Sequence, residues 1–172
     1  MFNNWVRFIL VSIIIILLQV WEFTPLALFK IATPFIYPIV LFFLPINTRE
    51  SIMTVVGFCI GLILDTLSGT PGLNTSAFTL TAFARNYLTS PLCDDEVNRE
   101  LIPSRFALGN GAFFLLLFEV MLLNTLVLFL LDALSLFDFV YFLKRFGSSF
   151  VFSYVVCVIF FLIFQQAEKD AK

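Results

Sequence analysis

Long apolar runs, separated by short breaks that carry charge or proline, dominate this chain. Because a transmembrane helix needs about 20 mostly apolar residues, each run predicts a membrane-spanning helix. Six such spans are expected. Their predicted ranges are residues 6–21, 26–45, 51–67, 75–90, 104–131 and 146–164.

Two of these runs are irregular. Lys30, Pro34 and Pro38 interrupt the second run, which predicts a kinked or partly re-entrant segment instead of a straight helix. The fifth run, 104–131, is longer than a perpendicular span requires, and this indicates either tilt or an extension beyond the lipid.

Residues 132–145, between the last two spans, have the periodicity of an amphipathic helix. Four apolar residues recur at i, i+3, i+4 and i+7: Leu136, Phe139, Val140 and Leu143. This spacing predicts a helix that lies at the membrane interface. Its apolar face is expected either to rest on lipid or to form a partner surface.

The composition identifies the class of protein. Of the 172 residues, 60% are hydrophobic and only 13% are charged, and the mean hydropathy is +1.02. A soluble domain of this size buries only about 70% of its chain surface and needs a charged exterior for the remainder. The breaks between the runs are too short to hold a folded domain. We therefore expect one all-α integral membrane domain, 1–172, arranged as a compact helix bundle.

The distribution of Lys and Arg predicts the orientation, because these residues accumulate at the cytoplasmic ends of spans. With six spans and a cytoplasmic N-terminus, the inner side has the larger basic set: Arg7, Arg49, Arg99, Arg105, Lys169 and Lys172. The outer side has Lys30, Lys144 and Arg145. Both termini are therefore predicted to be cytoplasmic. After Trp21 the chain lacks the small residues of a signal-peptide cleavage site, so the first span is expected to remain as an anchor.

The sequence offers little for catalysis. It contains no histidine, which excludes imidazole zinc sites and Ser-His or Cys-His nucleophiles. Cys59, Cys93 and Cys157 lack CxxC spacing and are interpreted as small apolar residues. The acidic run 94–96 is interpreted as a solvated loop. No enzyme activity, cofactor, metal site or nucleic-acid partner is expected.

Asp65 is the most informative residue, because a carboxylate in an apolar span is expensive. Gly57, Gly61 and Asp65 are spaced four apart, so they share one helical face that allows close approach of another helix. The simplest role for Asp65 is to bond to the backbone of the turn 68–74. An alternative role is to form part of an outer docking site.

The turn itself carries the residues that tight turns require: Ser68, Gly69, Pro71, Gly72 and Asn74. The two glycines permit unusual backbone angles and the proline adds rigidity. Asn74 or Thr75 is available to cap the next helix.

Arg85 and Glu119 form a second candidate pair. Counted from the outer ends of their spans at 1.5 Å per residue, both lie roughly 15–18 Å deep. Opposite charges at matched depth favour an ion pair inside the bundle. The alternative is that Arg85 extends toward the inner head groups.

The block from Gly57 to Asn74 resembles a motif of the bacterial rod shape-determining MreD family. The matching positions are Gly57, Phe58, Gly61, Leu62, Leu64, Asp65, Leu67, Ser68, Gly69, Pro71, Gly72, Leu73 and Asn74. The resemblance implies a non-catalytic scaffold of the cell-wall elongation machinery in the bacterial inner membrane. It also implies an MreC-like single-span partner and, through that partner, an MreB-like filament and peptidoglycan synthases.

The MreD family is similar in fold to the substrate-binding components of energy-coupling-factor transporters, so solute uptake is the alternative function. Those components present small residues on the first helix where it docks onto the transport module. Here the first span has only Ser12 as a small residue. Its outer loops also lack the polar and aromatic cluster of a vitamin pocket. The scaffold interpretation is therefore preferred.

Overall fold

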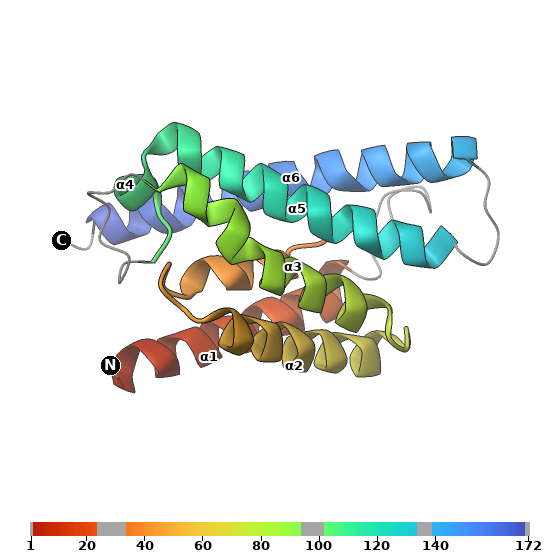
Figure 1. Ribbon diagram of the computed structural model, residues 1–172, viewed down its shortest axis with the longest axis horizontal. Helices are drawn as coiled ribbons and strands as arrows, with labels where there is room; N and C mark the ends of the chain where they lie inside the picture. The colour runs from red at the N-terminus through yellow and green to blue at the C-terminus, as the bar shows by residue number, and fades with distance from the viewer. Residues whose placement is uncertain (1, 24–33, 94–101, 134–138, 171–172) are drawn as a thin grey trace.

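The computed structural model describes residues 2–23, 34–93, 102–133 and 139–170 (Figure 1). Every regular element in these ranges is helical, as predicted. The α-helices are α1 (Phe2–Leu18), α2 (Glu50–Ser68), α3 (Leu73–Thr89), α4 (Arg105–Leu108), α5 (Asn110–Ala133) and α6 (Phe139–Asp170). A π-helical turn, η1 (Gln19–Phe23), extends α1, and there are two 3₁₀ helices, η2 (Tyr37–Phe43) and η3 (Ser90–Leu92).

Three helices within the described ranges are long and apolar enough to cross a membrane: Glu50–Ser68, Asn110–Ala133 and Val140–Leu162. The apolar part of the first helix, Phe8–Trp21, is shorter. Helix α3 has 17 residues and is about 25 Å long. The structure therefore supports a helical membrane protein, with three spans of full length among the six that the sequence predicts.

The helices form a bundle in which α3 packs against both α2 and α5, and α5 packs against α6. In Figure 1 the turn between α2 and α3 lies at the right-hand end of the bundle. The start of α1 and the end of α6 both lie at the opposite end. The two described ends of the chain thus lie at the same end of the bundle.

The second predicted span is not a transmembrane α-helix over residues 34–45. Pro34 and Pro38 lack the N–H groups that an α-helix needs, and the chain runs without regular structure to Ile36 before forming η2. Seven residues of 3₁₀ helix cover only about 14 Å, against about 30 Å for the hydrocarbon core. We call residues 34–45 the central segment. The other half of this predicted span, through residue 33, lies outside the described residues.

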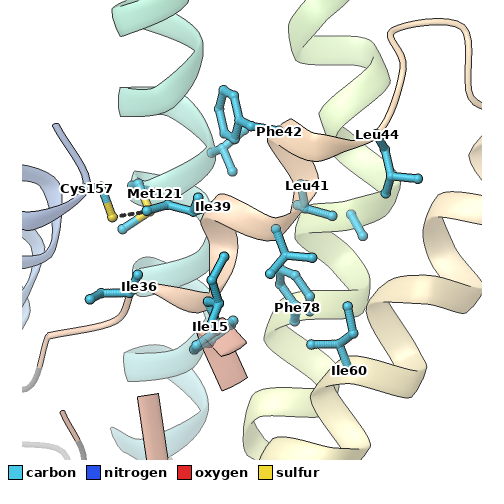
Figure 2. Close-up of a cluster of buried hydrophobic side chains, with 14 of the residues drawn as sticks. Ile15, Ile36, Ile39, Leu41, Phe42, Leu44, Ile60, Phe78, Met121 and Cys157 are labelled. Atoms are coloured by element: carbon cyan, nitrogen blue, oxygen red, sulfur yellow. Dashed lines mark hydrogen bonds between the residues drawn. The ribbon is translucent and has the colours of Figure 1, made fainter. Parts of the chain in front are cut away.

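The central segment lies in the hydrophobic core. Ile39, Val40 and Leu41 are completely buried. Figure 2 shows its side chains between Phe78 of α3 and Met121 of α5, with Ile60 of α2 nearby. Aromatic edge-to-face contacts join Tyr37 to Phe78 with ring centroids 5.1 Å apart. The interior of the bundle is therefore filled by the chain's own irregular segment.

The fifth predicted span is shorter than expected at its start. Gly109 separates α4 from α5, with φ 80° and ψ 161°, a backbone conformation that favours glycine. The side chain of Ser104 caps α4 by accepting a hydrogen bond from the Ala107 N–H. The apolar run from residue 104 is consequently a one-turn helix followed by a 24-residue span.

The prediction of a separate interfacial helix over 132–145 is also wrong. Helix α5 continues to Ala133, and the 32-residue helix α6 already begins at Phe139. Val140 and Leu143 therefore belong to the first turns of α6, where they are 60% and 55% exposed. Leu136 lies outside the described residues. From Phe139 onward, the predicted apolar positions belong to the start of a long helix.

Candidate functional site

Asp65, in the last turn of α2, is only 4% exposed and accepts five hydrogen bonds. Its Oδ1 accepts from Thr70 Oγ1 at 3.0 Å, from the Asn74 N–H at 2.9 Å and from Asn74 Nδ2 at 3.0 Å. Its Oδ2 accepts from the Thr75 N–H at 2.9 Å and from Thr75 Oγ1 at 2.6 Å. A carboxylate has about four lone-pair sites, so this one has none to spare.

These bonds make Asp65 the N-terminal cap of α3. Gly72 occupies the cap position and has no side chain to offer, so the first turn of α3 would otherwise leave its N–H groups unpaired. The carboxylate of the preceding helix accepts from two of them. A negative charge at a helix N-terminus is also favoured by the helix dipole. The interpretation of Asp65 as a structural residue bonded to its turn thus matches the observed contacts.

The turn between α2 and α3 depends on two glycines. Gly69 ends α2 with φ 68°, and its N–H donates to the Asp65 carbonyl. Gly72 has φ 83°, a left-handed conformation that other residues rarely adopt. Pro71 lies exposed between them, and Ser68 is partly exposed at the end of α2. The turn reverses the direction of the chain, so α3 runs back along α2. Asn74 and Thr75 thereby lie next to the Asp65 carboxylate.

Gly57 and Gly61 lie where α2 approaches α3 most closely. A Cβ atom added to Gly57 would be 2.6 Å from the Ala82 Cβ. One added to Gly61 would be 2.6 Å from the Thr75 Cα. Real Cβ atoms do not approach other heavy atoms this closely. The spacing of Gly57, Gly61 and Asp65 therefore corresponds to one α2 face, packed against α3.

The predicted ion pair between Arg85 and Glu119 does not form. Arg85 is 1% exposed and donates to the Leu44 carbonyl at 2.7 Å and to the Pro45 carbonyl at 3.1 Å. Its third hydrogen bond is to Asn86 Oδ1. These carbonyls lie at the C-terminal end of η2, where a positive charge is favoured. Nor does Arg85 extend toward the head groups, because its guanidinium forms its hydrogen bonds inside the bundle.

Two other polar side chains hold the start of the central segment. Gln19 donates to the Pro34 carbonyl at 3.0 Å and accepts from the Ile36 N–H at 2.7 Å. Ser153 of α6 accepts from the Phe35 N–H at 2.8 Å. At membrane depth, backbone that is not α-helical is tolerated only where protein groups form hydrogen bonds with its N–H and C=O groups. Gln19, Ser153 and Arg85 thus satisfy the central segment from three different helices.

Gln19 and Ser153 were not predicted from the sequence. A signal for both exists, because each is a polar residue inside a long apolar run, and such residues usually bond to other protein groups. The same is true of Tyr37 and Asn124, which are completely or almost completely buried and joined by a 2.9 Å hydrogen bond from Asn124 Nδ2 to the tyrosine oxygen. Tyr37 belongs to the central segment, and the other three are its neighbours.

A surface pocket of about 600 Å³ lies at the other end of α2, away from Asp65. It is formed by the loop before α2, the start of α2 and the end of α3. Its lining residues are Ile46, Asn47, Thr48, Arg49, Glu50, Ser51, Asn86, Tyr87, Thr89, Ser90 and Cys93. Asn86 donates to the Thr48 carbonyl at 2.7 Å and so fixes this loop to α3.

Within the ranges that the structure describes, no group of three or more Cys, Asp or Glu side chains is placed to hold a metal ion. Asp65 and Arg85, the buried charged side chains of the candidate site, both form hydrogen bonds with backbone groups. Comparison of the chain with protein-family models, with curated proteins and with solved structures gave no match. Function is therefore inferred from the motif residues and from the geometry of the bundle.

Proposed function

We propose that the chain is a non-catalytic membrane scaffold of the machinery that elongates the bacterial cell wall, acting with an MreC-like single-span partner. The proposal combines two kinds of support. The first is the resemblance of the Gly57–Asn74 block to the MreD motif. The second is the geometry of the bundle, whose buried charges hold its own backbone.

The observation that carries the proposal is the filled interior. The central segment occupies the core, and Tyr37, Ile39 and Leu41 are almost completely inaccessible. A solute-binding component needs a concave pocket with convergent polar groups. At the centre of the described residues that space is taken by the central segment, and the pocket of about 600 Å³ lies at the surface, at the start of α2. In this bundle Gln19 and Arg85, which could have lined such a pocket, bind the backbone of the central segment instead. A rigid body of this kind is suited to holding partners together.

The outer faces supply contact area for partners. Many large apolar side chains are more than 40% exposed on α1, η1, α2 and α6, including Trp21, Val55 and Val151. In a membrane these faces meet either lipid or the helices of other proteins. Association between helices in lipid depends on close packing and on polar contacts, and apolar faces of this kind supply contact area for the packing.

The test is to purify a tagged chain in mild detergent from the membranes of its source bacterium and to identify what accompanies it by mass spectrometry. Untagged membranes treated identically are the control. We expect a single-span MreC-like protein to be recovered in stoichiometric amounts. Recovery of transporter ATPase subunits in its place would contradict the scaffold role and favour solute uptake.

A further inference from the structure

Glu119 lies on the outward side of α5. The buried α5 residues around it are Leu116, Leu117, Val120 and Met121. Glu119 belongs instead to the ridge that runs Leu115, Glu119, Leu122, Leu126, Leu130 at helical spacing, and its first and last members are each 46% exposed. Glu119 itself is partly exposed. Its carboxylate therefore lies at the edge of the bundle and not in the core.

This carboxylate is also near the middle of its span. It is the tenth residue of the 24-residue helix α5, so its Cα lies about 14 Å from the start of the helix. The hydrocarbon core is about 30 Å thick, which places Glu119 close to its centre. In the described part of the structure, no hydrogen bond or ion pair engages Glu119, whereas Asp132, the other acid of α5, pairs with Arg145.

A mid-depth acid that faces outward is costly in lipid, by roughly 2.5–3.5 kcal/mol on insertion scales. Within a membrane protein such a residue usually finds a partner. We propose that the outward ridge of α5 is a docking surface for a membrane-spanning helix of another protein, and that this helix presents a Lys or Arg side chain to Glu119 at mid-depth. The inference deepens the proposed function and rests on it for the identity of the partner.

A second copy of this chain fits the surface less well. Arg49 and Arg105 lie at helix starts, and Lys144 and Arg145 lie near the start of α6, so none is near mid-depth. Arg85 is buried and already donates to the central segment. Among the residues whose side chains are described, the chain thus has no cation that could reach Glu119 of a neighbouring copy.

The test uses the purified full chain in phosphatidylethanolamine–phosphatidylglycerol vesicles. The probe is a fluorescent 23-residue Leu/Ala transmembrane helix with one central Lys, and a matched helix has Leu at that position. Association is measured by energy transfer to a label on the chain. We expect the Lys helix to associate about tenfold more tightly than the Leu helix, and we expect E119L to abolish this preference. D132N, which alters the other acid of α5, should retain it.

Three results would overturn the docking surface: equal association of the two probe helices, a Lys preference that survives in E119L, or Glu119-dependent energy transfer between copies of the chain. The thermal stability of the isolated E119L chain in detergent must stay unchanged, because a loss would mean that Glu119 acts within the bundle. If the single-span partner co-purifies but the Lys preference is absent, the docking surface is wrong and the scaffold role stands. If the Lys preference is present but the single-span partner does not co-purify, the scaffold role is wrong and the docking surface stands.

Discussion

At the scale of the residue, Asp65 shows how a carboxylate is accommodated in an apolar helix. Its five donors come from Thr70, Asn74 and Thr75, all within ten positions along the chain. Because these partners are local, the sequence was sufficient to predict that Asp65 bonds to its own turn. These hydrogen bonds offset the cost of burying the carboxylate, and they connect the end of α2 to the start of α3.

The variant D65N should destabilise the isolated chain. Asparagine has the same shape but only one acceptor oxygen, so some of the N–H and O–H donors now bound to the carboxylate would lose their acceptor. We expect a loss of about 2–4 kcal/mol in the free energy of unfolding, measured in mixed detergent micelles. T66A is the control, since the Thr66 hydroxyl is exposed and bonds only to its own helix. Equal stability of the two variants would mean that Asp65 is not the cap.

Arg85 and Glu119 show that equal depth along two helices does not determine whether two side chains make contact. Depth along a helix says nothing about rotation around its axis, and Glu119 is turned away from the side of α5 that packs into the core. The true partners of Arg85, the Leu44 and Pro45 carbonyls, lie about forty positions away in sequence. No local pattern identifies a backbone carbonyl as the partner of a distant arginine.

A double-mutant cycle separates the two arrangements. R85M alone should lower the free energy of unfolding by about 2–4 kcal/mol, because two buried carbonyls lose their donor. E119Q alone should have little effect on the isolated chain. The coupling energy between the two changes should be within about 0.5 kcal/mol of zero. A coupling energy of several kcal/mol would instead show that Arg85 and Glu119 form the ion pair.

At the scale of the element, the close packing of α2 on α3 follows from spacing that the sequence displays. Two glycines four apart define a face without side chains, and the turn brings the next helix onto that face. The central segment was less predictable. Its prolines show that an α-helix must break, but not where the broken chain lies, because that depends on Gln19, Arg85 and Ser153 in three other helices.

The helix–helix contact predicts a difference between two glycine variants. G61A adds a Cβ that meets the backbone of Thr75, so α3 must shift, and we expect a loss of about 1–3 kcal/mol in the free energy of unfolding. G111A is the matched control, because a Cβ at Gly111 of α5 meets nothing within 4 Å. Thermal melting of both variants in detergent makes the comparison. Similar melting temperatures would show that α2 and α3 are not held at this distance.

At the scale of the whole molecule, the apolar runs were enough to predict a helical membrane protein. They overestimated the regularity of the bundle, since Gly109 divides the fifth run and α6 already begins at Phe139. What the runs could not predict is that the interior is filled by the chain itself. That feature comes from contacts between segments far apart in sequence, and it is the feature on which the proposed scaffold role depends.

The most direct measurement of that role is cell shape after depletion of the protein from the cells that produce it. The scaffold account predicts that rod-shaped cells become round and that the wild-type chain, supplied from a plasmid, restores rods. Rod-shaped cells that persist after depletion, with a fall in uptake of a vitamin or another small solute, would contradict it.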